Sequence, residues 1–283
     1  MNRTVLSLLA AGALSLGLLQ VAGAVPEAGT VVQLAELPAA ARNTLQTRAG
    51  TAQVGEILKT VEGGEATYDV VITGQGKSRG FTVNDSGELL AEQVFLEELP
   101  RPAQDAIRKQ VGNGTLGDLS KITEDGDVSY EAQMTKAGRT RGFTVDQDGD
   151  LLDIQVFLGE TPAPVRAAIR RELRGGKCGE IYKSTEEGAT EYEVEITRDG
   201  KSRQVTFDAR GKIVYQAEPV ALADTPEAVQ STLKGQLSEA RLLHIDKALE
   251  DGKVTYEVEL AKAGKHQALS IRPNGQILPA DAD

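Results

Sequence analysis

A seven-residue motif occurs four times along the chain, and it constrains the fold more than any other feature. The first copy begins at Val32 and has the form V-x-L-x-E-L-P, and related copies begin at Val94, Val156 and Val220. The steps between copies are 62, 62 and 64 residues. Self-similarity at such a period is the signature of tandem repeats. The predicted repeats span 32–93, 94–155, 156–219 and 220–283.

The first 24 residues have the pattern of a secretory signal peptide. Arg3 forms a short basic region, residues 5–21 are apolar, and Ala22-Gly23-Ala24 fits a cleavage site. A membrane anchor is the alternative, but the apolar run is short for a span of about 20 residues. We therefore expect cleavage after Ala24, an N-terminal arm at residues 25–31, no membrane span after cleavage, and a periplasmic or secreted protein.

Each repeat continues with a helical pattern after its proline. Apolar residues recur at the third, seventh and eleventh positions, which places them on one helix face. Thr161 and Thr225 precede the proline in two repeats and are good N-cap residues. The expected buried helix positions are Ala41, Leu45, Ala49, Ala103, Ile107, Val111, Val165, Ile169, Leu173, Val229, Leu233 and Leu237.

Three or four strands are expected after each helix. A tyrosine starts the clearest strand pattern, in which Tyr192, Val194 and Ile196 alternate with Glu193 and Glu195. Such alternation is typical of an antiparallel sheet with one buried face. The predicted fold class is therefore α+β: four tandem repeats, each an amphipathic helix on a three- to four-stranded antiparallel sheet. Because 62 residues make a marginal core, we also expect neighbouring repeats to share strands or pack helices together.

Charge and cysteine content limit the function. The formal net charge is -11, which argues against a nucleic-acid partner, disfavours anionic lipid and favours cationic partners. A single cysteine, Cys178, precludes an intrachain disulfide. It is expected to be a small buried or half-buried thiol, with pairing between chains as the alternative.

Two further patterns could indicate ligands. Asp146-Gln147-Asp148-Gly149-Asp150 resembles a calcium loop, but it lacks the full acidic pattern of an EF-hand, and a β-hairpin turn explains it better. Arg79, Arg141 and Arg203 recur in three repeats. They are expected at the rim of the sheet, with an anion site as the less favoured alternative. No metal or cofactor is predicted.

Taken together, these motifs resemble the PepSY and PepSY-like domain family, which is likened to β-lactamase-inhibitor-protein repeats. The resemblance rests on V-x-L-x-[ED]-x-P, the following helix, G-x-x-x-Y-[DE]-[VA] and the later glycine turn, from Val32 to about Asp283. It implies an exported protein that binds or restrains another protein, for example a peptidase. It supplies no catalytic residue.

We therefore predict a protein that is not an enzyme and binds a protein or peptide. A hydrolase that uses carboxylates, a structural envelope spacer and a cation-binding module are the alternatives, and the oligomeric state stays open. The partner is expected on the sheet face opposite the helices, which alternation makes acidic. The predicted binding residues are Glu131, Tyr182, Glu193, Glu195, Glu257 and Glu259.

Overall fold

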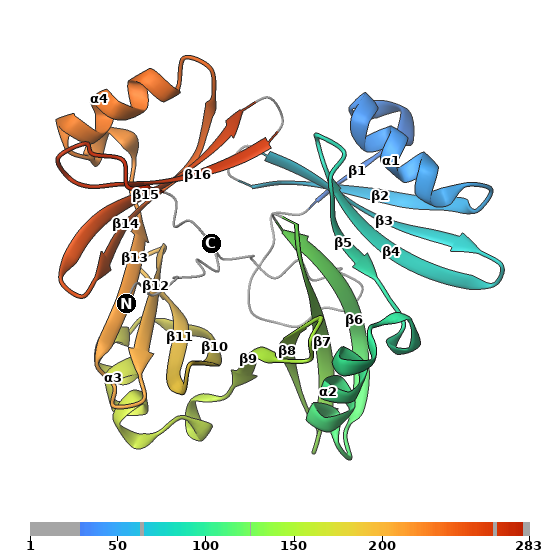
Figure 1. Ribbon diagram of the computed structural model, residues 1–283, viewed down its shortest axis with the longest axis horizontal. Helices are drawn as coiled ribbons and strands as arrows, with labels where there is room; N and C mark the ends of the chain where they lie inside the picture. The colour runs from blue at the N-terminus through green and yellow to red at the C-terminus, as the bar shows by residue number, and fades with distance from the viewer. Residues whose placement is uncertain (1–28, 63–64, 125, 263–264, 280–283) are drawn as a thin grey trace. The chain divides into compact units, whose positions relative to one another are not determined.

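The computed structural model describes residues 29–62, 65–124, 126–262 and 265–279 (Figure 1). The predicted signal peptide and residues 25–28 of the predicted arm lie outside these described residues. None of the helices in the described ranges is long and apolar enough to cross a membrane.

The same order of elements recurs along the chain: a short 3₁₀ helix, an α-helix and then strands. The 3₁₀ helices are η1 (Leu34–Glu36), η2 (Leu96–Glu98), η3 (Leu158–Glu160) and η4 (Leu222–Asp224). The α-helices are α1 (Ala39–Ala49), α2 (Arg101–Val111), α3 (Ala163–Leu173) and α4 (Glu227–Gln236).

The strands are named in chain order. The first eight are β1 (Thr30–Val32), β2 (Gln53–Glu62), β3 (Glu65–Gly74), β4 (Lys77–Asn84), β5 (Leu89–Gln93), β6 (Thr115–Glu124), β7 (Asp127–Lys136) and β8 (Arg139–Asp146). The next eight are β9 (Leu151–Val156), β10 (Lys177–Glu186), β11 (Ala189–Arg198), β12 (Lys201–Asp208), β13 (Ile213–Pro219), β14 (Arg241–Glu250), β15 (Lys253–Lys262) and β16 (Lys265–Ile271).

The start of each α-helix differs slightly from expectation. The prolines Pro38, Pro100, Pro162 and Pro226 occupy the N-cap position itself. Thr161 is therefore not the helix cap: its hydroxyl donates to the Leu158 carbonyl of η3, at 2.8 Å. Thr225 does the same to Leu222 in η4, at 2.8 Å. These threonines close the 3₁₀ turn, because the proline after each already has the extended backbone of a cap.

The predicted fold class is wrong in its central claim, because the strands do not form four separate sheets. They form one 16-stranded antiparallel sheet, with the strands in chain order. Within residues 94–277, the last strand expected for one repeat also pairs with the first strand of the next. Thus β9 pairs with β8 through Ile154 and Phe143, and with β10 through Ile154 and Lys183.

The junction at β13 has the same two-sided pairing. Tyr215 of β13 lies opposite Thr206 of β12 and opposite Glu250 of β14. The physical reason is that an isolated three- or four-stranded sheet would leave a row of unpaired backbone groups at its edge. Continuous pairing satisfies those groups. The proposed boundaries of the four repeats stay predictions.

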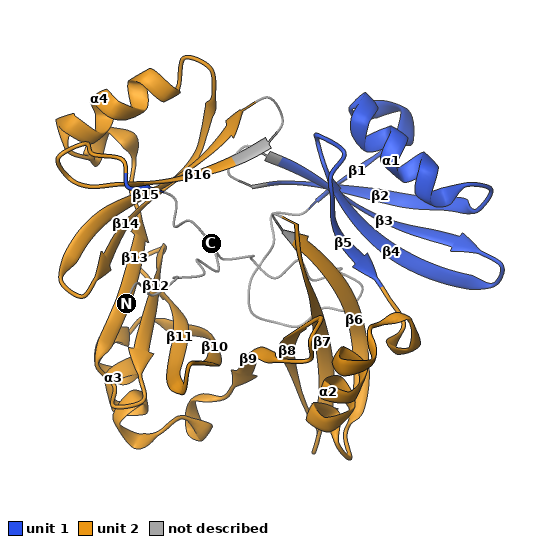
Figure 2. Cartoon of the chain, in the orientation of Figure 1, with its two compact units in different colours: residues 1–93, 278–283 blue, residues 94–277 orange. Residues whose placement is uncertain are grey.

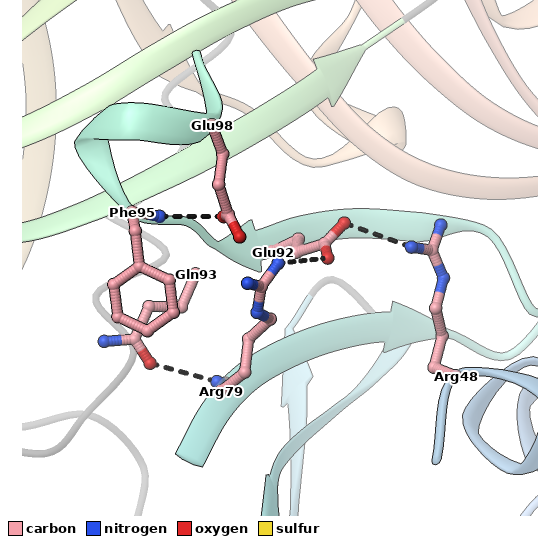
Figure 3. A network of polar contacts seen from close by, with 7 residues as sticks. Arg48, Arg79, Glu92, Gln93, Phe95 and Glu98 are labelled. Atoms are coloured by element: carbon pink, nitrogen blue, oxygen red, sulfur yellow. Dashed lines mark hydrogen bonds and ion pairs between the residues drawn. The ribbon is translucent and has the colours of Figure 1, made fainter. Parts of the chain in front are cut away.

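The chain divides into two compact units: residues 1–93 with 278–283, and residues 94–277 (Figure 2). In the first, Glu92 of β5 accepts from Arg48 of α1, at 3.1 Å, and from Arg79 of β4, at 3.2 Å (Figure 3). The Gly80 backbone N–H donates to the Gln93 side chain, at 3.1 Å. These bonds fix β5 against β4 and α1.

The helices cover the sheet face predicted for them. In residues 94–277, Ile107 of α2, Ile169 of α3 and Leu233 of α4 are completely buried. Each packs in a cluster with the tyrosine and alternate apolar residues of the nearby strands. The helix periodicity is thereby confirmed, except that Leu173 and Leu237 are half-buried at the helix ends. The other sheet face carries the candidate site.

Candidate functional site

The predicted acidic residues point to the sheet face opposite the helices, as alternation requires. Tyr192 and Val194 are 7% and 1% exposed on the helix side, whereas Glu193 between them is half-buried on the other. Glu131 on β7 and Glu257 and Glu259 on β15 are half-buried in the same way. Of the predicted carboxylates only Glu195 is exposed. Most of the predicted carboxylates on this face are therefore partly shielded from solvent.

Tyr182 of β10 lies on this face and is tied into a polar network. It stands opposite Gln155 of β9 and Glu193 of β11 in the strand register. Its hydroxyl donates to Glu180, at 2.6 Å, and Gln155 donates to the other oxygen of Glu180, at 2.9 Å. The phenol is held in place rather than free to rotate.

Sequence reasoning missed two residues of the same face, Asp153 on β9 and Tyr215 on β13. Asp153 is only 8% exposed and accepts a hydrogen bond from the Thr144 hydroxyl. Tyr215 donates its hydroxyl to Glu257, at 2.8 Å. The alternation of β9 and β13 could have placed both residues, but the expected last strand of each repeat was not followed beyond its start.

These side chains form a continuous series, which we call the acidic row: Glu131, Asp153, Tyr182, Glu193, Tyr215 and Glu257. Tyr182, Glu193, Thr206 and Tyr215 are successive register partners across β10 to β13. Three strand spacings of about 4.8 Å give this part a length of about 14 Å. The charges of Glu131 and Asp153 act on Tyr182, and that of Glu193 acts on Tyr215.

Burial alters the acidity of the acidic row. It raises the pKa of Glu193, and the charge of Asp153 adds to that increase. Burial likewise raises the pKa of Asp153 and of Glu257 above the usual carboxyl range, against the lowering effect of their hydroxyl donors. Asp153, Glu193 and Glu257 are thus held in surroundings that disfavour their charge, as is common at functional sites.

The first unit has only part of this arrangement. Asp69 of β3 is half-buried, accepts from the Thr82 hydroxyl at 2.5 Å, and has a pKa raised by burial. However, Leu58 and Ala91 occupy the positions that Tyr182 and Asp153 occupy later in the chain. The acidic row is therefore a property of residues 94–277.

We expect Glu193→Gln with Glu257→Gln to stabilise the protein at pH 7, by about 1 kcal/mol. The pKa of each residue is raised in the folded state, so its favourable contribution is complete at low pH and is lost as pH rises through the folded pKa. Neutral glutamine avoids that loss, and the added stability of the double variant should vanish near pH 4. Thermal unfolding of the parent and the double variant between about pH 4 and pH 7 measures this difference.

The control for this prediction is Glu195→Gln, because Glu195 is exposed on the same strand. Its stability should change by less than about 0.5 kcal/mol. A double variant that is less stable than the parent at pH 7, or whose gain is the same at every pH, would contradict the electrostatic explanation.

The arginines considered as an anion site are engaged with carboxylates. Arg79 pairs with Glu92, Arg141 with Glu160 at 2.9 Å, and Arg203 with Glu172 at 2.6 Å. These ion pairs connect β4, β8 and β12 to the elements beside them.

The acidic turn at residues 146–150 is a β-hairpin turn between β8 and β9. The Asp146 carboxylate accepts the backbone N–H groups of Asp148 and Asp150, at 3.0 and 2.8 Å. Gly149 has φ +85°, and a Cβ there would lie 2.7 Å from the Pro102 carbonyl oxygen. The glycine is needed for the turn to pass under the start of α2. Within the described ranges no group of three or more His, Cys, Asp and Glu side chains has a metal-binding arrangement.

Cys178 is exposed rather than buried or half-buried. It lies at the start of β10, just before the register shift between Cys178 and Ile181. Desolvation by neighbouring parts of the chain still raises the pKa of this exposed thiol, which disfavours the reactive thiolate.

Comparisons with known proteins find limited structural similarity. A DUF2874 family protein from Bacteroides uniformis is 20% identical over 42% of this chain and 86% of its own, with a TM-score of 0.36. A candidate periplasmic protein from Bacteroides eggerthii is 17% identical over 42% and 87%, with a TM-score of 0.37. A BLIP-like protein from Bacteroides fragilis is 19% identical over 42% and 84%, with a TM-score of 0.33.

No family model and no curated protein matches the sequence. The resemblance to PepSY-like repeats is therefore still a prediction, and the structural similarities do not establish a family at these TM-scores.

Proposed function

We propose that this chain is an exported, non-enzymatic protein that binds a cationic polypeptide segment of another protein through the acidic row. The observation that carries the proposal is the series of carboxylates and tyrosines on a sheet face to which α2, α3 and α4 do not contribute. The net charge of -11 gives the whole chain the sign that attracts such a partner. Export is supported by the predicted signal peptide.

The composition of the acidic row fits a polypeptide better than an inorganic cation. Tyr182 and Tyr215 lie between the carboxylates and offer aromatic rings to the charged groups of lysine and arginine side chains. Their hydroxyl bonds hold the rings in place, which lowers the entropy lost on binding. The half-buried carboxylates gain from a partner's charge because they are poorly solvated in its absence.

If the bound segment belongs to the active-site surface of an enzyme, binding would restrain or inhibit that enzyme. The alternative is a structural envelope spacer. The binding experiment below distinguishes it from a binding protein, because a spacer needs no affinity for a cationic chain.

A hydrolase that uses carboxylates is the second candidate, and one observation favours it: burial raises the pKa of Glu193, and the charge of Asp153 adds to the increase. Paired carboxyls with displaced pKa values are typical of acid–base catalysts. We nevertheless propose that the protein is not an enzyme, because of the residues that surround Asp153 and Glu193. Tyr182 and Tyr215 are hydrogen-bonded to other carboxylates, and no histidine, cysteine or serine nucleophile is part of the row.

The binding test uses a defined probe, a short oligolysine peptide, with oligoglutamate as the negative probe. We expect the parent protein to bind oligolysine with micromolar affinity at low salt. Glu131→Gln, Asp153→Asn, Glu193→Gln and Glu257→Gln together should weaken binding by about tenfold or more. Isothermal titration at low and high salt measures this loss, since screening weakens exposed charge interactions.

The matched control removes the same number of charges elsewhere on residues 94–277. It combines Glu97→Gln, Glu186→Gln, Glu187→Gln and Glu227→Gln, all exposed positions outside the acidic row. Equal losses in the two quadruple variants would mean that only net charge matters. No binding of oligolysine by the parent protein would leave the spacer as the better account.

A further inference from the structure

A strongly basic surface lies at the carboxyl end of α3, in a chain that is acidic overall. Six exposed side chains form it, and we call it the basic end of α3. It consists of Arg170, Arg171, Arg174, Lys177, Arg198 and Lys201.

Three elements bring these residues together. After α3 the chain turns sharply through Arg174, which has φ 44°, and the Gly176 N–H donates to the Leu173 carbonyl at 2.7 Å. Lys177 then starts β10 opposite Thr197. The hairpin tip of β11 and β12 lies alongside, because a Cβ on Gly176 would meet the Arg198 side chain at 3.2 Å. Arg198 and Lys201 face each other across that hairpin.

The basic end of α3 has few acidic neighbours. Glu172 is already engaged by Arg203, at 2.6 Å. Asp199 makes only a long contact with Arg198, at 3.8 Å. Among the described residues, Arg170, Arg171, Arg174, Lys177 and Lys201 form no ion pair. At the matching end of α2, by contrast, Arg108 pairs with Asp105 of its own helix.

The helix dipole accounts for only part of this charge. Cations in the last turn of a helix are stabilised by its negative end, which explains Arg170 and Arg171. Lys177, Arg198 and Lys201 belong to strands and hairpins, and they bring mutually repelling charges to the same place. A surface that gathers such charges with only one long internal ion pair in the described ranges, Arg198–Asp199 at 3.8 Å, is complementary to an external anion.

We propose that the basic end of α3 binds a flexible polyanion that carries phosphate groups. Four of the six residues are arginines, and the guanidinium group matches phosphate oxygens in a two-pronged geometry. A flexible polymer contacts only this surface, whereas a planar anionic membrane also meets the surrounding acidic surface of a chain with net charge -11. This site is separate from the acidic row and independent of the function proposed for it.

The experiment titrates the whole mature chain with short-chain inorganic polyphosphate. Six contacts predict a slope of log affinity against log salt of about -4, since each contact contributes about 0.7 in a flexible polyanion. Arg170→Gln, Arg171→Gln and Arg174→Gln together should lower affinity by about tenfold or more and bring the slope to about -2. Circular dichroism confirms that the variant is folded.

The matched control is Lys109→Gln, Lys136→Gln and Lys234→Gln, which removes three exposed charges near the ends of other helices. It should keep the affinity of the parent. Equal losses in both triple variants, or no polyphosphate binding by the parent at about 50 mM salt, would overturn the proposal. So would vesicles of anionic phospholipid that bind as tightly as polyphosphate, because the ligand would then be a membrane surface.

Discussion

Ile154→Pro is expected to lower the free energy of unfolding by about 3 kcal/mol or more. Ile154 lies in β9, which pairs with β8 on one side and with β10 on the other. Proline has no N–H for either ladder, and a central strand has no position where this loss is harmless. Because β9 is hydrogen-bonded to β8 on one side and to β10 on the other, the damage should extend to both of these strands.

Hydrogen exchange shows which strands lose backbone hydrogen bonds in the variant. In Ile154→Pro, backbone amides of both β8 and β10 should lose protection. Ile154→Ala is the control, since it removes the half-buried side chain while keeping the N–H. If proline costs no more than alanine, or if only β8 loses protection, β9 does not form the continuous junction described above.

Phe207→Ala is expected to cost about 3–5 kcal/mol. Phe207 of β12 is completely buried, in the same cluster as Ile169 of α3 and Tyr192 of β11. The chain has 5 phenylalanines and no tryptophan, so each core depends on a few large side chains. Removal of the ring leaves a cavity that the surrounding strands, fixed by their ladders, cannot fill.

The measurement is thermal unfolding followed by circular dichroism. Phe207→Leu is the control, because it keeps a large apolar side chain, although a smaller one, and should cost less than about 1.5 kcal/mol. A similar loss for leucine and alanine would show that ring shape, rather than buried volume, governs this core. A loss below about 1 kcal/mol for alanine would mean that the cluster repacks.

Most of the local structure was predictable. The positions of the helices, the buried helix residues and the side of the sheet that Glu193 and Glu257 face all follow from periodicity. Alternation has a period of two and helices a period of 3.6, and these periods are visible in single stretches of sequence. The exposure of Cys178 was not predictable, because it depends on what packs nearby.

The candidate site was predictable only in part. Glu131, Glu193 and Glu257 recur at the same place in the motif, so alternation alone found them. Asp153 and Tyr215 were missed because they lie in the last strand of their repeats, of which the pattern marked only the first residue. Tyr215 bonds to Glu257, a residue 42 positions later, and no local pattern reports such a contact.

The sequence by itself determined the repeated order of helix and strands, because that order depends on local propensities, prolines and glycine turns at constant spacing. Only the tertiary structure decided that the strands form one antiparallel sheet rather than four. Backbone hydrogen bonds join strands whatever their side chains are, so the edge at which one group of strands meets the next has no signature in sequence. In this continuous sheet β9 lies between β8 and β10, and β13 lies between β12 and β14. Their side chains Asp153 and Tyr215 thereby complete the acidic row.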